Sequence, residues 1–167
     1  CTGNSARSIM AESLINFRGE NNFRGYSAGS HPTGFVQPLA LGLLKKINMP
    51  IDNLRSKSWQ EFMSPDAPQM DYIITVCDSA AAEVCPIWPG LPTTTHWSIP
   101  DPAVTTTNRE QNIEMYRRAF HDLERRISAF IQKPYINLAS YDVNEVSGSF
   151  WSINIDGSMY FPEHNGN

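Results

Sequence analysis

Apolar positions along the chain recur at two spacings, which together predict helices alternating with strands. Residues 36–47 carry apolar side chains three and four positions apart, as one face of an amphipathic helix does. Residues 72–76 are uniformly apolar and β-branched, which is typical of a strand buried on both faces. The same patterns predict helices over 5–19, 58–63 and 107–130, a short helix or loop over 79–84, and strands over 23–28 and 93–99.

This alternation predicts an α/β fold in which helices flank a parallel sheet. We expect the long helix to open with a capping box formed by Thr107 and Glu110. Residues 134–167 differ in character, because they are polar and rich in Asn and Ser. An Asp156-Gly157 turn between two short apolar runs predicts either a hairpin or a poorly ordered tail there. We therefore expect one domain over residues 1–133 and a divergent C-terminal tail over 134–167.

Composition narrows the function classes. The chain has 167 residues, of which 41% are hydrophobic and 18% charged, as in a globular domain. A net charge of −4 argues against a nucleic-acid partner, and no apolar run approaches the roughly 20 residues that cross a bilayer. Three cysteines without a secretory leader indicate reactive thiols in a reducing compartment, so we expect a cytoplasmic protein.

The first eight residues form the candidate anion loop. Cys1 and Arg7 are separated by five residues, Ser8 follows, and a helix begins at this point. Such a loop can turn backbone N–H groups toward a tetrahedral anion, while Arg7 donates two hydrogen bonds and the helix dipole lowers the pKa of Cys1. The bare spacing also fits a structural cysteine beside a surface arginine. The predicted anion-binding residues are Thr2, Gly3, Asn4, Ser5, Ala6, Arg7 and Ser8.

The whole octapeptide, followed by Ile-Met-Ala-Glu, resembles the phosphate-binding loop of low-molecular-weight protein tyrosine phosphatases and of arsenate reductases that share their fold. The resemblance extends from Cys1 to about Lys133. It implies a flavodoxin-like parallel sheet flanked by helices. In that family a hydrophobic strand precedes the loop cysteine in the middle of the sheet. Because this sequence begins at the cysteine, we expect a sheet that lacks this first central strand, and an inactive anion-binding fragment is one alternative.

The resemblance also implies the other catalytic residues. Asp101 lies between two prolines and would be the general acid, although a Pro-Asp-Pro turn needs no catalytic role. Cys77 and Cys85 would form a disulfide relay with Cys1, although both could be small buried residues, and a zinc site that includes His96 is a weaker alternative.

The implied function is the reduction of arsenate to arsenite, with phosphate or sulfate as mimics of the substrate. Such a reaction needs an external thiol reductant of the thioredoxin or glutaredoxin type and no tightly bound cofactor or metal. The identity of the reductant stays open, as does monovalent cation binding near Asn4 and Ser27. The second alternative is a phosphatase, but Ala103 and Val104 follow the Asp-Pro pair where phosphatases usually carry aromatic residues.

Overall fold

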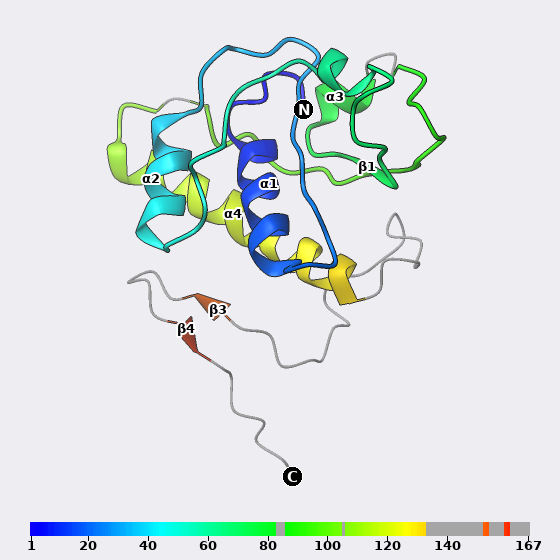
Figure 1. Cartoon of the computed structure of the whole chain (residues 1–167). Coiled ribbons are helices and arrows are strands. Elements are labelled where there is room, and N and C mark those ends of the chain that lie inside the picture. The colour runs from blue at the N-terminus through cyan, green and yellow to red at the C-terminus, as the bar shows by residue number, and fades with distance from the viewer. Residues whose placement is uncertain (83–85, 105, 133–151, 154–158, 161–167) are drawn as a thin grey trace.

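The computed structural model describes residues 1–82, 86–104, 106–132, 152–153 and 159–160 (Figure 1). Its regular elements confirm the predicted α/β order, with boundaries that differ by a few residues. In chain order they are α1 (Arg7–Arg18), α2 (Pro38–Lys46), the 3-10 helix η1 (Trp59–Phe62), β1 (Tyr72–Thr75), α3 (Asp78–Ala82), β2 (Thr93–His96), α4 (Arg109–Gln132), β3 (Ser152–Ile153) and β4 (Met159–Tyr160).

Strands β1 and β2 form a parallel two-stranded sheet. Strand β1 pairs with β2 in a register that joins Tyr72 to Thr93 and Thr75 to His96. Strands β3 and β4 form a separate antiparallel pair, which agrees with the predicted hairpin, while residues 154–158 between them lie outside the described residues. The parallel β1–β2 pair confirms the expected parallel sheet, and the domain boundary at residue 133 stays a prediction.

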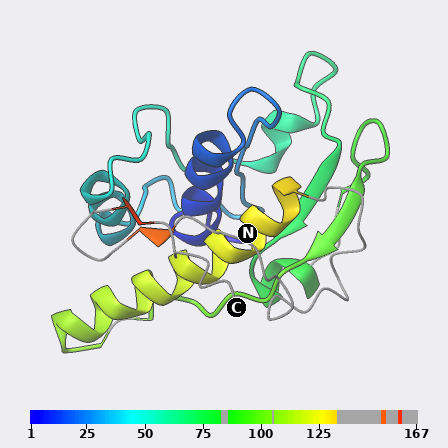
Figure 2. The same ribbon diagram turned by 90° about the horizontal axis from the view of Figure 1, so that it is seen from below.

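The hydrophobic core lies among helices α1, α2 and α4 and the strand pair. Helix α4 runs along α1 and reaches the strands at its C-terminal end (Figure 2). At that end, the Phe130 ring contacts Phe23, Tyr72 and Trp97, with centroid distances of 5.6, 5.0 and 6.3 Å. The aromatic contacts therefore join α4 to β1 and to the residue that follows β2. The largest fully buried apolar side chains are Ile9, Met10, Leu14, Leu44, Ile99, Leu123 and Ile127.

The predicted strand over residues 23–28 is wrong. In the described part of the chain this segment forms no ladder, and the nearest pairing is an isolated parallel bridge between Gly29 and Ser58. A groove of about 1030 Å³ lies between the segment and β1 and is lined by both. A strand needs a hydrogen-bonded neighbour, and the groove separates this segment from its nearest candidate.

Strand β1 is also more open than its sequence suggested. Its four residues are all half-buried, whereas a strand covered on both faces was expected. Within the described residues β1 pairs along one edge only, with β2, and β3 pairs with β4.

Helix α4 begins later than the capping-box prediction. The side-chain oxygen of Asn108 accepts hydrogen bonds from the backbone N–H groups of Glu110 and Gln111, at 2.9 and 3.3 Å, so Asn108 takes the capping role that was expected of Thr107. Asn is at least as good an N-cap as Thr, and sequence spacing alone cannot choose between neighbours. None of the helices in the described ranges has the length and apolarity needed to cross a membrane.

Candidate functional site

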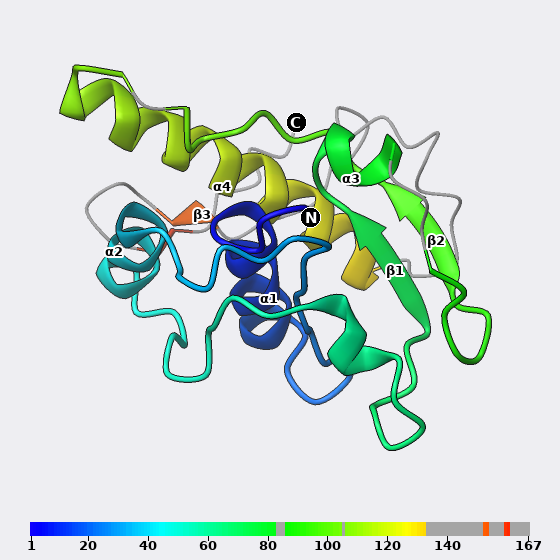
Figure 3. The ribbon, with the colours of Figure 1, turned by 90° about the horizontal axis from the view of Figure 1, so that it is seen from above.

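The anion loop, residues 1–8, leads into the N-terminus of α1 beside the C-terminal ends of the strands (Figure 3). The carbonyl oxygens of Thr2, Gly3 and Ser5 accept hydrogen bonds from backbone N–H groups in residues 31–37, at 3.0, 3.0 and 2.8 Å. Three carbonyl oxygens of the loop are thus engaged by the 31–37 segment, which is compatible with an anion held by loop N–H groups.

Asn4 fixes the shape of the loop. Its backbone has φ of 44°, in the left-handed region, and its side chain is fully buried. The side-chain amide donates to the hydroxyl oxygens of Ser8 and Ser27, both at 2.9 Å, and its oxygen accepts from the backbone N–H of Lys57 at 2.8 Å. These three hydrogen bonds join the loop to α1, to Ser27 and to Lys57. The Ser8 hydroxyl oxygen, at the start of α1, is thus one of the acceptors of the Asn4 amide.

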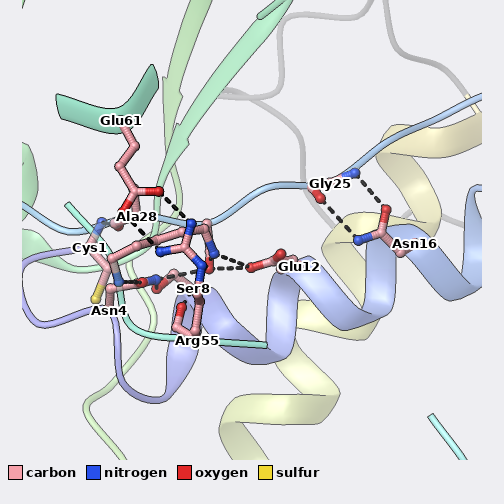
Figure 4. Close-up of polar contacts among 11 residues, drawn as sticks. Cys1, Asn4, Ser8, Glu12, Asn16, Gly25, Ala28, Arg55 and Glu61 are labelled. Atoms are coloured by element: carbon pink, nitrogen blue, oxygen red, sulfur yellow. Dashed lines mark hydrogen bonds and ion pairs between the residues drawn. The ribbon is translucent and has the colours of Figure 1, made fainter. Parts of the chain in front are cut away.

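A buried charged pair adjoins this asparagine. The Lys57 ammonium lies 3.1 Å from a Glu12 carboxylate oxygen, which also accepts the hydroxyl of Ser27. Figure 4 shows Asn4 in the loop that precedes α1, and Ser8 and Glu12 along the first turns of the helix. Sequence reasoning missed Lys57 and Glu12 as site residues. The available signal was Glu12 itself, an acidic residue one turn after Ser8 on a helix face that packs inward.

Arg7 and Asp101 meet at the edge of the loop. A guanidinium nitrogen of Arg7 lies 3.1 Å from Asp101, and another donates to the carbonyl oxygen of Ile99 at 3.0 Å. The second Asp101 oxygen accepts the backbone N–H of Ala103, so this residue forms a turn and also faces the arginine. Burial, together with the charge of Asp101, raises the pKa of Tyr116 nearby. The two alternatives for Asp101, turn former and acid, are therefore geometrically compatible.

Cys77 lies against the anion loop. It is 2% exposed, and its sulfur accepts the backbone N–H of Thr2 at 3.4 Å, with the Thr2 hydroxyl 3.7 Å away. Burial alone would raise its pKa, but hydrogen bonds from Thr2 and the backbone of Ala80, with the N-terminal positive charge, lower the pKa below its usual value. The structure thus brings Cys77 beside the residue that follows Cys1. Cys85 lies outside the described residues.

The residue after Cys77 is anchored to strand β2. The two ring nitrogens of His96 lie 3.0 Å from an Asp78 carboxylate oxygen and 2.7 Å from the Thr75 hydroxyl. Hydrogen bonds from Ser98 and His96 lower the pKa of Asp78. Because both nitrogens of His96 have hydrogen-bond partners, the geometry does not favour the zinc-site alternative.

Comparisons with known proteins agree with this geometry. The family described as low molecular weight phosphotyrosine protein phosphatase matches residues 1–137. An arsenate reductase of Halalkalibacterium halodurans is 33% identical over 132 residues, which is 79% of this chain and 91% of that protein. One from Bacillus subtilis is 30% identical over the same shares. The crystal structure of arsenate reductase from Archaeoglobus fulgidus has a TM-score of 0.62 and 26% identity, covering 80% of this chain and 96% of that one.

Proposed function

The chain belongs to the low molecular weight phosphotyrosine protein phosphatase family, and we propose that within it this protein is an arsenate reductase. The observation that carries the proposal is the position of the Cys77 sulfur, which accepts a hydrogen bond from the loop residue next to Cys1. A phosphatase of this family needs a nucleophile, an arginine and an acid at the loop. A second thiol at the loop suits a reaction in which two thiols are oxidised to a disulfide, as in the reduction of arsenate.

Anion binding is the first step. Arsenate would accept hydrogen bonds from backbone N–H groups of residues 2–8 and from the Arg7 guanidinium, whose planar donors suit two anion oxygens. Arg7 already spans the site, because it contacts both Asp101 and Ile99. The arriving anion competes with the Asp101 carboxylate for this guanidinium. Protonation of Asp101 removes that competition and supplies the proton for the next step.

The covalent step joins sulfur to arsenic. The Cys1 thiolate attacks arsenic(V), a hydroxyl group leaves, and Asp101 gives the proton that turns it into water. Cys77 then attacks the Cys1 sulfur. The S–As bond breaks, its electron pair stays on arsenic, and arsenite leaves as arsenic(III) with Cys1 and Cys77 joined by a disulfide. The lowered pKa of Cys77 favours the thiolate that this attack needs.

The relay then passes to Cys85. Its thiolate attacks Cys77, Cys1 leaves as a thiolate, and an external dithiol of the thioredoxin or glutaredoxin class reduces the Cys77–Cys85 disulfide. Helix α3 follows Cys77 directly and covers Asp78–Ala82. A continuous helix from 77 to 85 would separate the two Cα atoms by about 12 Å, whereas a disulfide needs less than roughly 7 Å. We therefore expect α3 to unwind on oxidation. This thiol chemistry suits a reducing compartment, which supports the cytoplasm as its location.

The test is arsenate-dependent consumption of NADPH with thioredoxin and thioredoxin reductase, compared for wild type and the variants C1S, C77S and C85S. All three variants should lose turnover. Only C1S should also lose hydrolysis of p-nitrophenyl phosphate, which needs the nucleophile but not the relay, so this assay serves as an internal control for folding. In a single turnover, C85S should release one arsenite per chain and accumulate the Cys1–Cys77 disulfide, detectable by mass spectrometry.

Other outcomes distinguish the alternatives. If phosphotyrosine analogues turn over well while wild type, C77S and C85S all leave arsenate unreduced, the protein is a phosphatase. If wild type binds phosphate but neither reaction proceeds, the protein is an inactive anion-binding fragment. Loss of arsenate turnover in C1S alone would also contradict the relay.

A further inference from the structure

Asn4 of the anion loop and three buried residues beside it form a closed ring of hydrogen bonds. The Lys57 backbone N–H donates to the Asn4 oxygen at 2.8 Å, and the Asn4 amide donates to the Ser27 hydroxyl at 2.9 Å. The Ser27 hydroxyl donates to Glu12, and the Lys57 ammonium closes the ring on the same carboxylate oxygen at 3.1 Å. All four side chains are at least nine-tenths buried. Lys57 therefore enters the ring twice, once through its backbone and once through its side chain.

The ring acts on the loop at its one left-handed residue. Asn4 holds φ of 44°, a region that residues other than Gly adopt only when surrounding contacts maintain it. In this chain those contacts come from Ser8, Ser27 and Lys57. If Asn4 relaxed to an ordinary conformation, the N–H groups on either side of it would rotate away from a common centre.

Residues 56–58 are themselves tied to the loop. The Ser56 hydroxyl donates to the Gly3 carbonyl oxygen at 3.3 Å, and the Lys57 carbonyl oxygen accepts the N–H of Gly29 at 2.9 Å. The Lys57 ammonium also donates to the Arg55 carbonyl oxygen, at 3.3 Å. The lysine thus stands where the loop, α1 and the 27–30 segment meet, and each of the three contributes an atom to its surroundings.

The charge on this lysine has a specific partner. Glu12 is buried, and an ionised carboxylate away from water needs a cation or several donors. With Lys57 present, Glu12 can stay ionised and accept from Ser27, which in turn leaves the Ser27 oxygen oriented to accept from Asn4. Removal of the ammonium would leave the buried Glu12 carboxylate without its cation, so the carboxylate would turn toward water and the ring would open at Ser27.

We propose that Lys57 is a positioning residue of the anion loop, whose ammonium, through Glu12 and Ser27, holds Asn4 in the conformation that makes the loop N–H groups converge on the substrate anion. Lys57 does not touch the anion. Its effect passes through two intermediate side chains. The anion concerned is the arsenate of the proposed function, on which this inference rests, and inorganic phosphate serves as its probe.

The experiment measures the Kd of inorganic phosphate by calorimetry in wild type, K57M, K57R and E124Q. Met removes the charge at similar length, and Arg keeps it. E124Q is the matched control, because Glu124 pairs with Arg18 between α4 and α1, away from the loop, and is similarly buried. We expect the Kd to rise roughly tenfold or more in K57M, as for a misplaced binding group, to stay near wild type in E124Q, and to recover largely in K57R.

Turnover separates positioning from a general loss of folding. If the lysine only stabilised the fold, K57M would contain less folded enzyme, so kcat would fall at unchanged KM. Positioning predicts that the KM for arsenate rises in parallel with the phosphate Kd. Should K57M fail to fold, the double variant K57M/E12Q removes the buried pair without leaving a lone charge, and its phosphate Kd should still exceed that of wild type.

A wild-type Kd in K57M, or in the double variant, would overturn the inference. An equal rise in E124Q would do so as well, because it would reduce the effect to lost stability. Failure of the proposed function looks different. In that case wild type binds phosphate and responds to K57M as expected, yet does not turn over arsenate.

Discussion

Substitution of Gly29 by alanine is a sharp test of how closely the anion loop is packed. A Cβ atom added at Gly29 would lie 2.3 Å from the Thr2 carbonyl oxygen and 3.0 Å from both the Cys1 carbonyl oxygen and the Asn4 Cβ. Gly29 cannot retreat, because its N–H donates to Lys57 and its carbonyl oxygen accepts from Trp59, at 2.9 and 3.0 Å. The added methyl group must therefore displace the loop.

The size of the effect follows from that distance. Real Cβ contacts are almost never shorter than 3.0 Å, so the Thr2 carbonyl has to move by at least about 0.7 Å. Displacements near 1 Å at a reacting centre can cost about 100-fold in rate, and overpacking costs about 1–3 kcal/mol of stability. For a chain of this size each kcal/mol lowers Tm by about 2–4 °C. We expect G29A to remain folded at the assay temperature while its turnover of arsenate falls about 100-fold.

The assays are arsenate turnover, phosphate binding and thermal unfolding, with G42A as the matched control. Gly42 lies on the exposed side of α2, and a Cβ there would meet nothing within 4 Å. Alanine favours a helix over glycine by about 0.5–1 kcal/mol, so G42A should melt slightly higher and keep full activity. Wild-type phosphate binding and turnover in G29A would refute the close packing described here.

Three further substitutions test single contacts. D101N should lower arsenate turnover about 100-fold or more, because the acid is lost, yet should bind phosphate as tightly or more tightly by calorimetry, because Arg7 no longer pairs with a carboxylate; weaker binding would contradict the competition. T2V removes one hydroxyl near the Cys77 sulfur, so the midpoint of Cys77 alkylation against pH should move upward, and an unchanged or lower midpoint would show that the hydroxyl does not favour the thiolate. N108A removes the cap of α4 and should cost about 1 kcal/mol in thermal unfolding, with turnover unchanged, whereas T107A should cost little.

Helices were easier to predict than strands because helical periodicity is local. The apolar spacing in residues 36–47 placed α2 within two residues of its observed ends, since helix hydrogen bonds join neighbours in the sequence. Residues 23–28 have the composition of a strand but form no ladder in the described part of the chain. A strand depends on a partner that the sequence of the segment itself does not specify.

The site residues likewise differ in whether the sequence alone could identify them. The loop residues, Arg7 and Asp101 were identifiable from a contiguous motif and a family resemblance. The resemblance assigned Cys77 to a relay with Cys1, and the structure places the Cys77 sulfur beside the loop. Lys57 and Glu12 are 45 residues apart, and no local pattern joins them. Only the folded chain shows that they form one buried pair.

The anchoring of Asp78 sets the direction in which helix α3 can come apart. Asp78 is bound to β2 through His96, and its own backbone follows Cys77 without a break. A helix held at its first residue has its hinge there, so unwinding must proceed from the far end toward that point. In the proposed relay, the Cys77 sulfur therefore stays in place against the loop, and the Cys85 sulfur moves to reach it.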